Sequence, residues 1–598
     1  MSSISLRIAA CLAAFFCIAL PAAHAAEANS ERFDGPAELP RIYLQTSMAD
    51  TPAPGKVHNI KSGGDLQSAL NNASCGDTLS LEAGATFTGR FVFPKKNCDD
   101  SHWIIVRTSA PDSELPPQGS RLTPCYAGVS SLPGRPDLHC TSTTNVLAKL
   151  VFAAKAGEGP VIFAPNANHY RLTGLEITRA PGPYRITALI APEVRSGADH
   201  IVLDRLWAHG TAQDETTRGV FLTGTAFISI VDSTFTDFHC VAITGACGDS
   251  QAIGGGSGDL PGGPYKIVDN FLEASGENIL FGGGPATITP ADIEIRRNHF
   301  FKPLFWKPGQ PDFVGGTSGK PFIVKNLFEL KNAQRVLFEG NVLDYSWGGV
   351  GQKGFAIMIT PKNAQSQCPT CRVTDLTMRY NKVRHMASAM DIANVPADTG
   401  GIATAGERYS IHDMIFEDID GTAYVGFGAF AIILSNSPPL RDVTIDHVTA
   451  FPPTVLMSIT AFLDQPLPER FVITNSILSA AEREVASAGG GPRNCATGVV
   501  QLGPEAVLRK CFKTFNFSHN AILAPRKPWP KDNWFPKNED SLGFVEFNRG
   551  KESNYRLCRD NAQTSTCKKS SPYAHAATDG KDVGADVDAI EAATRNVE

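Results

Sequence analysis

Short stretches in which apolar and polar residues alternate recur along most of this chain. In each stretch two apolar residues flank a polar one, and a polar or small residue follows, as in the run from Ile293 to Asn298. Alternation with a period of two is the pattern of a short β-strand. The repeats start at eleven positions: Tyr170, Ile201, Ile228, Tyr265, Ile293, Val336, Leu376, Met414, Val443, Phe471 and Phe515.

The spacing of these starts predicts a solenoid. The ten intervals between position 170 and position 515 average about 34 residues, which lies in the range of known repeat architectures. In such architectures one supersecondary unit stacks on the next, and terminal units need a cap. Because the repeated unit is a strand, we expect an all-β parallel solenoid. The run Leu66–Asn72 predicts one or two helical turns that cap its first rung.

The N-terminus has the form of a secretory signal. Arg7 precedes the apolar run 8–20, and Ala23-His24-Ala25 offers a cleavage site between small residues, so residues 1–25 are predicted to be a signal peptide. That run is too short to cross a bilayer, and no later stretch approaches about 18 consecutive apolar residues. We therefore expect a secreted or periplasmic protein without a membrane partner.

One solenoid domain is expected over residues 56–570. Residues 26–55 are rich in Pro and Ala and indicate a leader or linker. Residues 571–598 are expected to form a polar C-terminal tail, with a short helix after an N-cap at Asp588.

The net charge of −6 is mild for 598 residues and argues against a nucleic-acid partner. We expect a monomer.

The cysteines predict disulfides between close neighbours. Of the 14 cysteines, Cys11 and Cys17 lie in the signal, and an even number remains, which favours disulfides in an exported chain. The expected pairs are Cys75/Cys98, Cys125/Cys140, Cys240/Cys247, Cys368/Cys371, Cys495/Cys511 and Cys558/Cys567. The Cys368-Pro369-Thr370-Cys371 run also fits half a zinc site or a redox motif, but no second CxxC accompanies it.

A ladder of small polar residues follows the strand of successive repeats. Its members are Asn270, Asn298, Asn341, Asn381 and Asn520, with Ser233 and Ser476 at the same place. Stacked amides can hydrogen-bond along the axis of the coil, and Asn tolerates the left-handed backbone of a tight turn.

With the repeat, the Gly-Gly-Asp-Leu-Gln-Ser-Ala-Leu run of the cap and this ladder, the chain resembles the pectin-lyase-like superfamily over roughly residues 60–560. The resemblance implies a right-handed parallel β-helix with three strands per rung, in which the Asn turn follows the second strand. It also implies that the first-strand sheet lines a carbohydrate groove, so that the outward side chains of that sheet matter most.

Alternation within the first strands selects the outward side chains. It points Asn278, Glu329, Lys331 and Asp391 away from the core. Rungs of a solenoid stack about 4.8 Å apart, so two carboxylates and an amine would share one small patch. A solvated ion pair between Glu329 and Lys331 is the plainer interpretation of the same positions.

Long insertions next to this patch supply further candidates for binding a substrate. Trp306 with Lys302 and Lys307 would suit an anionic sugar, because an indole can stack on a ring while ammonium groups bind its acid group. Arg296, which points outward from a second strand, is a further candidate. Trp306 could instead anchor its loop in the core.

The first chemistry that fits the patch is β-elimination on a uronic-acid-containing polysaccharide. Lys331 would be the base, with its pKa lowered by neighbouring cations or by burial. Glu277 and Glu329 could hold a Ca²⁺ ion that neutralises the substrate carboxylate, and no other cofactor is expected. The run from Leu330 to Asn341 is similar to the segment around the base lysine of the chondroitinase B and alginate lyase family. The Arg-His-Gly and Glu-x-Glu runs of that family are missing here.

Two other functions fit the same groove. Glu329 and Asp391, two rungs apart, would lie at about 10 Å, near the upper end of the range for inverting glycoside hydrolysis. A polysaccharide-binding protein without catalytic activity is the third possibility. The sequence does not name the sugar or its linkage.

Overall fold

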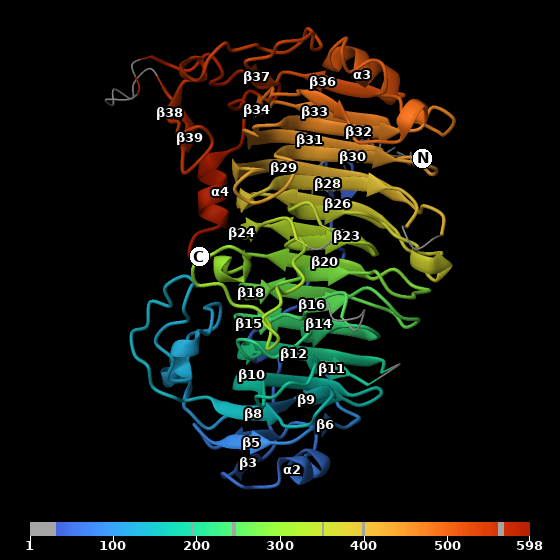
Figure 1. The fold of residues 1–598 in the computed structure, drawn as a ribbon. Coiled ribbons are helices and arrows are strands. Elements are labelled where there is room, and N and C mark those ends of the chain that lie inside the picture. The colour runs from blue at the N-terminus through green and yellow to red at the C-terminus, as the bar shows by residue number, and fades with distance from the viewer. Residues whose placement is uncertain are drawn as a thin grey trace, which may run out of the picture.

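Short parallel strands that stack along one axis make up most of the chain (Figure 1). The computed structural model describes residues 32–193, 196–241, 247–349, 352–397, 401–559, 567 and 569–598. The predicted signal peptide, residues 1–25, and the first part of the predicted leader lie outside the described residues. Within the described part, no helix has the length and apolar character needed to cross a membrane.

The first strand of each rung belongs to a sheet of twelve parallel strands, here called sheet 1. Its members are β6 (Phe91–Phe93), β9 (Gly157–Phe163), β11 (Ile186–Pro192), β13 (Arg218–Phe221), β16 (Gln251–Gly255), β19 (Glu277–Phe281), β22 (Phe328–Leu330), β25 (Phe355–Ile359), β28 (Ser388–Asn394), β30 (Ala429–Ser435), β32 (Val455–Ala461) and β35 (Val485–Ser487).

The second strands form sheet 2, which contains the repeat starts. Its members are β3 (Val57–Ile60), β4 (Thr78–Leu81), β7 (Ile104–Thr108), β14 (Thr225–Val231), β17 (Tyr265–Val268), β20 (Ala291–Arg296), β23 (Ala333–Glu339), β26 (Val373–Arg379), β33 (Glu469–Thr474) and β36 (Phe515–Ser518), with the first halves of β10 (Asn168–Arg179), β12 (Ala198–His209), β29 (Gly406–Ile419) and β31 (Arg441–Ala450).

The third strands form sheet 3. Its members are β5 (Thr86–Thr88), β8 (Ala148–Phe152), β15 (Thr234–Phe238), β18 (Phe271–Ala274), β21 (His299–Phe301), β24 (Val342–Ser346), β27 (Lys382–Met386), β34 (Ile477–Ser479) and β37 (Ala521–Leu523), with the second halves of β10, β12, β29 and β31.

Sheets 2 and 3 are joined by these four long strands. Each of them pairs in sheet 2 through its first half and in sheet 3 through its second half, as β12 does with β14 and β15. The hydrogen-bonded network therefore closes on itself. Its strands nevertheless pair with the rung before and the rung after, all in parallel, so they stack along a coil rather than around a barrel. The predicted all-β parallel architecture is confirmed.

The predicted repeat starts coincide with the register of sheet 2, with one exception. Ile293 pairs with Val336, and Val336 pairs with Leu376. The partner of Leu376 in the next rung is Tyr409, not Met414. Met414 lies in the second half of β29 and pairs with Val448. The predicted start at Met414 is therefore wrong by five residues.

The polar ladder forms as predicted and is buried inside the coil. Nδ2 of Asn298 donates to Oδ1 of Asn341 at 3.1 Å, and Nδ2 of Asn341 donates to Oδ1 of Asn381 at 3.0 Å. The left-handed residue of each turn is the one before the Asn, for example Arg297 with φ of 55°. The expectation that the Asn itself adopts this backbone is therefore wrong.

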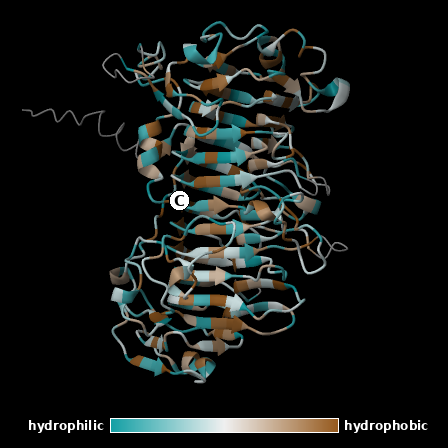
Figure 2. Cartoon of the chain, turned by 60° about the vertical axis from the view of Figure 1, so that its left-hand side comes forward, coloured by the Kyte–Doolittle hydropathy of each residue, from teal (hydrophilic) through white to brown (hydrophobic). Residues whose placement is uncertain are grey.

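A single apolar core fills the coil from Ile60 to Trp529. Hydrophobic and hydrophilic segments alternate along the strands in Figure 2, in agreement with the period of two. Helix α2 (Leu66–Asn72) lies at the end of the coil where the first rungs are, with Asp65 as its N-cap and Leu66 and Leu70 buried. Helix α3 (Pro504–Cys511) lies at the opposite end and buries Val507 and Leu508 in the same core.

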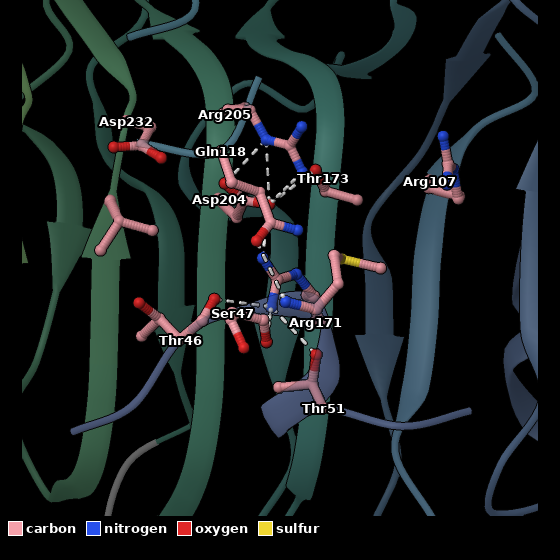
Figure 3. A network of polar contacts seen from close by, with 12 residues as sticks. Thr46, Ser47, Thr51, Arg107, Gln118, Arg171, Thr173, Asp204, Arg205 and Asp232 are labelled. Carbon is pink, nitrogen blue, oxygen red and sulfur yellow. Dashed lines mark hydrogen bonds and ion pairs between the residues drawn. The ribbon is translucent and has the colours of Figure 1, made fainter. Parts of the chain in front are cut away.

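The segment predicted as a leader or linker packs against the coil where it is described. Its short hairpin, β1 (Phe33–Asp34) and β2 (Ala37–Glu38), lies beside β26. Farther along, Arg171 Nη1 donates to the carbonyl of Thr46 at 3.0 Å, and its Nη2 donates to Asp204 at 2.7 Å (Figure 3). Because it is fixed at both ends, this arm, residues 32–51, is not a free linker.

The predicted tail also packs on the coil. Helix α4 (Val587–Ala593) covers part of sheet 3, and its N-cap is Asp586 rather than the predicted Asp588. Before it, β38 (Phe544–Glu546) and β39 (Asn554–Leu557) form an antiparallel pair. Short 3₁₀ turns lie at Met48–Asp50, Asp112–Glu114, Pro124–Tyr126, Leu304–Trp306, Ala364–Ser366, Gly491–Arg493 and Glu539–Ser541.

All six predicted disulfides are present. They are Cys75–Cys98, Cys125–Cys140, Cys240–Cys247, Cys368–Cys371, Cys495–Cys511 and Cys558–Cys567. Each closes a loop of at most 23 residues, so the bonds fix local excursions rather than distant rungs. The Cys368-Pro369-Thr370-Cys371 run is one of these loop staples. Disulfides of this number are typical of proteins in oxidising compartments.

Candidate functional site

Charged side chains gather on the outer face of sheet 1 near the middle of the coil. The strand register places Leu280, Glu329, Met358 and Asp391 in one column on successive rungs. Glu329 and Asp391 are therefore two rungs apart, with Met358 between them. At about 4.8 Å per rung, their backbones are separated by about 10 Å.

Lys331 is bound to Glu329. Its Nζ lies 2.8 Å from Oε1 of Glu329, and only about a fifth of the lysine side chain is exposed. Burial alone would lower the pKa of Lys331, but Glu329 and Glu277 favour the ammonium form and raise it. The prediction that the pKa of this lysine is lowered is wrong, because the nearest charges are carboxylates rather than cations.

The glycine run before β22 makes room for this lysine. Gly282 has φ of 109°, which a residue with a side chain rarely adopts. A Cβ at that position would come within 2.7 Å of Cβ of Lys331, and one at Gly283 would lie 3.8 Å from its Nζ. The backbone of this turn therefore forms a surface on which the lysine side chain lies.

A second lysine extends the network by one rung. Lys325 Nζ lies 3.3 Å from Oε1 of Glu277 and forms an ion pair with Asp249. Gln251 Nε2 donates to the other oxygen of Glu277 at 3.0 Å. Burial alone would raise the pKa of Glu277, but Lys325 and Lys331 lower it to about 2. Glu277 is therefore a buried anion between two cations.

Two carboxyl groups next to the ion pairs are shifted in the opposite direction. Burial raises the pKa of Asp391 to about 7; the charge of Lys362 opposes this shift and that of Glu329 adds to it. Its Oδ1 is buried and makes no hydrogen bond with the described residues. Burial and the charge of Glu277 raise the pKa of Asp249 to about 6. Near neutral pH, Asp391 is therefore about half protonated, while Glu329 lies in contact with the ammonium of Lys331.

The predicted calcium ligands do not fit a metal ion. Ca²⁺ takes six to eight oxygen ligands, whereas Glu277 and Glu329 are each within 3.3 Å of a lysine ammonium. The lysine nitrogens lie where a cation would have to bind. No step of the proposed chemistry is therefore assigned to calcium.

Two predicted substrate contacts are buried. Lys302 is fully buried and donates to the carbonyls of Ala274 and Gly276 at 2.8 and 2.6 Å. It also donates to Oδ1 of Asn278 at 2.8 Å, while Nδ2 of Asn278 donates to backbone carbonyls. Both side chains donate hydrogen bonds to backbone carbonyls at the turn between sheet 3 and sheet 1. The outward placement predicted for Asn278 is wrong, and neither residue can reach a ligand outside.

The remaining candidates lie away from the patch. Trp306 is fully buried and packs edge-on against Phe322, with ring centroids 5.6 Å apart, so it anchors its loop. Lys307 follows it in the same loop after sheet 3 and is partly exposed. Arg296 belongs to sheet 2, where it pairs with Glu294 at 3.1 Å and Glu339 at 2.8 Å. None of these residues joins the network of Glu329.

Sequence reasoning missed a hollow at the edge of sheet 1. A cavity of about 350 Å³ opens there, and its lining includes Phe221, Thr223, Glu193 and Pro285. The guanidinium of Arg218 lies 4.9 Å from the ring centroid of Phe221. An aromatic ring with polar groups around it is a surface on which a sugar can stack.

Comparisons with known proteins find distant structural likenesses only. No protein-family model matches this chain, and no curated protein sequence matches it significantly. Among solved structures, pectate lyase Pel9A is similar with 11% identity and a TM-score of 0.34, over 90% of this chain and 97% of that one. The GH87 alpha-1,3-glucanase of Streptomyces thermodiastaticus strain HF3-3 has 11% identity and a TM-score of 0.40, over 83% and 72%.

A third neighbour, the PL6 family alginate lyase AlyGC, has 11% identity and a TM-score of 0.42 over 86% of this chain. This chain spans 58% of that enzyme. The stacked parallel rungs described above are what the resemblance of the sequence to the pectin-lyase-like superfamily led us to expect. At these identities and TM-scores, neither a substrate nor a reaction follows from the neighbours.

Proposed function

We propose that the outer face of sheet 1 binds a polysaccharide and cleaves its glycosidic bonds, with Asp391 and Glu329 as the acid–base pair. One observation carries the proposal. The two carboxyl groups share an outward column two rungs apart, and the pKa of Asp391 is raised to about 7 while Glu329 is paired with Lys331. Environments that separate the protonation states of two carboxyl groups are typical of a glycosidase site.

Hydrolysis by this pair proceeds in one step. Protonated Asp391 donates its proton to the glycosidic oxygen as the bond to the anomeric carbon breaks. Glu329 accepts a proton from the water that attacks the same carbon from the other side. A backbone separation of about 10 Å is nearer to the spacing of about 6.5–9.5 Å between the carboxyl groups of inverting enzymes than to the spacing of about 5 Å in retaining ones. The Lys331 ammonium, 2.8 Å away, orients the carboxylate of Glu329.

β-Elimination is the second candidate, and the cations of sheet 1 favour it. Lys331, Lys325 and Arg218 lie on this face, where they could bind the carboxylate of a uronic acid. Lys331 would also have to give up its proton to act as the base, and the neighbouring carboxylates oppose that loss. Hydrolysis therefore replaces elimination as the preferred reaction.

Three further predictions from the sequence are part of this proposal. They are a right-handed coil capped by α2, export to the periplasm or the medium, and an anionic polysaccharide as the partner. Parallel crossover connections are right-handed in almost all known proteins, which supports the first of these.

The test uses purified protein and a panel that includes pectate, alginate, glucuronan, glycosaminoglycans and α-1,3-glucan. New reducing ends and absorbance of unsaturated uronides are followed together, with and without calcium. Wild type is compared with Asp391→Asn, Glu329→Gln and Lys331→Ala, and with Glu546→Gln, an exposed acid outside the site, as the matched control.

Each outcome of this test assigns a reaction. Reducing ends without new absorbance, lost in Asp391→Asn and Glu329→Gln but kept in Glu546→Gln, support hydrolysis by the pair. A rise in absorbance that disappears in Lys331→Ala would replace hydrolysis with elimination. Binding of a polysaccharide without any cleavage would leave a non-catalytic binding protein and overturn the proposal.

A further inference from the structure

A second cluster of chemically active side chains lies on sheet 2 near the N-terminal end of the coil. His169 and His200 occupy the same position on successive rungs, directly before the paired residues Tyr170 and Ile201. Both have left-handed backbones, with φ of 56° and 49°. Their rings stack with centroids 4.6 Å apart and planes 3° apart.

A third side chain reaches the two rings from another part of the chain. Asp100 lies in the loop that follows Cys98, which is fixed by its disulfide to Cys75. Its Oδ1 lies 3.1 Å from Nε2 of His169. One ligand atom from each of Asp100, His169 and His200 lies within 4.8 Å of the other two, the only such group of three or more among the residues that the structure describes.

Neighbouring side chains fix the orientation of both imidazoles. Nδ1 of His169 is 3.0 Å from Oδ1 of Asn168, and Nδ1 of His200 is 2.5 Å from Oδ1 of Asp199. In the tautomer that donates through Nδ1, each ring has its lone pair on Nε2, and in His169 this nitrogen faces Asp100. A histidine that donates through one nitrogen and binds through the other is the usual arrangement around a metal ion.

The surroundings also hold the His169 ring in place. His169 is 8% exposed, and Trp103 packs edge-on against its ring at 5.0 Å. The carboxylate of Asp100 is largely exposed and can approach an ion from the solvent side.

We propose that Asp100, His169 and His200 form a site for a divalent transition metal ion of the Zn²⁺ class, bound through two imidazole nitrogens and one carboxylate oxygen, with water in the fourth position. Imidazole ligands select Zn²⁺, Cu²⁺ or Ni²⁺ over Ca²⁺ and Mg²⁺. Ligand distances of about 2.0–2.2 Å require the three atoms to move closer together, and the exposed Asp100 side chain and a tilt of the rings supply that movement.

The ion would tie the loop after Cys98 to two rungs of the coil. A stack of His169, His200 and Phe227, joined to Asp100 by a hydrogen bond alone, is the competing explanation. Phe227 continues the stack at 4.5 Å and cannot bind a metal. The two explanations differ in what happens when the ion is offered.

The experiment uses full-length mature protein without a histidine tag, treated with chelator and titrated with ZnCl₂ by calorimetry. We expect one ion per chain and a rise in melting temperature. Asp100→Asn changes an exposed side chain and should weaken binding at least tenfold, and His200→Asn should abolish it. His139→Asn, an exposed histidine elsewhere, is the matched control and should bind as wild type does.

Co²⁺ provides a second readout that does not depend on stability. A tetrahedral Co²⁺ site absorbs visible light, and the band should be lost in His200→Asn and kept in His139→Asn. Absence of a stoichiometric site in wild type, or equal affinity for Zn²⁺ in wild type and both site variants, would show that the cluster is an aromatic stack without a metal.

Discussion

Nζ of Lys331 lies 2.8 Å from Oε1 of Glu329 on the outer face of sheet 1. This contact changes the role that the sequence suggests for the lysine. An ammonium group held by a carboxylate is a poor base, because the pair stabilises its proton. The same contact fixes the position of the Glu329 carboxylate on this face, which suits a general base. The contact therefore favours the Glu329 carboxylate over the Lys331 amine as the base of the proposed reaction.

Removal of the Glu329 charge should release the proton of Lys331 more easily. In Glu329→Gln we expect the pKa of Lys331 to fall, because its closest anion is lost. The rate at which Lys331 reacts with an acylating reagent at pH 9, measured by mass spectrometry, should rise several-fold, since one pKa unit is a factor of ten in the free amine. Glu546→Gln should leave the rate unchanged. An unaltered rate in Glu329→Gln would mean that the pair does not control this lysine.

The proposed acid predicts the alkaline limb of the pH profile. Asp391 must carry its proton to protonate the leaving group, and its pKa is raised to about 7 by burial. Activity should therefore decline as pH rises through about 7. Asp391→Asn should lower the rate by about 10² to 10⁴-fold and remove this limb. A variant that keeps the limb would assign the titration to another group.

The same shift has a consequence for stability that needs no substrate. The folded pKa of Asp391 is above the value of about 3.9 in an unfolded chain. Its contribution to stability is therefore fully present below about pH 4 and is lost as pH rises through about 7. Asp391→Asn lacks this loss, so we expect its urea midpoint to exceed that of wild type at pH 8 and to approach it at pH 4. Equal midpoints at both values would contradict the raised pKa.

The rungs could be predicted from the sequence because every turn of the coil needs apolar residues at the same inward positions. Ile293, Val336 and Leu376 pair in register as the period requires. The exception, Met414, has a physical reason. β29 runs through sheets 2 and 3 as one strand of 14 residues without a polar turn, so its alternation offers two equivalent starts. Only the pairing with neighbouring rungs selects Tyr409.

A charge ladder shows a pattern that was visible in the sequence but was missed. The residue before six successive starts in the register of sheet 2 alternates between Asp and Arg: Asp292, Arg335, Asp375, Arg408, Asp442 and Arg470. Arg335 binds Asp292 at 2.7 and 3.0 Å, and Arg408 binds Asp375 at 2.7 and 2.8 Å. Neighbouring rungs thus have opposite charges at this position. An alignment of the repeats in the sequence shows the alternation.

The site was predictable only where it rests on strand alternation. That rule placed Glu329 and Asp391 on one outward column. Lys325 and Asp249 come from segments outside the strands, where no period operates, and no local pattern in the sequence marks them. The prediction that Lys302 contacts a substrate was wrong for a related reason. It lies just past the end of β21, where the chain turns into the coil, and its charge is solvated by backbone carbonyls.

Interrupting the buried amide ladder should lower the free energy of unfolding. Asn341→Ala removes the acceptor of the Asn298 backbone N–H and of its Nδ2, at 2.9 and 3.1 Å. Each buried group left without a partner costs about 1–3 kcal/mol, so we expect a loss of about 3 kcal/mol in unfolding free energy. Asn341→Ser should lose less, because serine occupies this place at Ser233. Urea midpoints would be compared with the exposed control Asn548→Ala, and a loss equal to the control would dismiss the ladder as a source of stability.

The N-terminal arm is held at its hairpin by a histidine and an arginine, and farther along by Arg171. Nε2 of His412 lies 3.0 Å from Asp34, and its Nδ1 lies 2.8 Å from Asp413. Burial alone would lower the pKa of His412, but these two carboxylates raise it to about 9. Arg379 Nη1 also donates to Asp34 at 2.7 Å, so His412 supplies the pH-dependent part of this anchor. The opposite end of the arm is bound by Arg171, which donates to a backbone carbonyl there.

The hairpin of the arm should therefore loosen in alkali while its other end stays in place. The contribution of His412 is fully present below its unfolded pKa of about 6.5 and is lost as pH rises through about 9. We expect the protection of residues 33–38 against hydrogen exchange, corrected for the intrinsic rate, to fall between pH 8 and pH 10. Protection of residues 46–51 should persist over the same range. His412→Gln should show the loss of protection already at pH 7, whereas His139→Asn should not. If both segments lose protection together, the arm is released as a unit and the His412 contact is not its pH-dependent anchor.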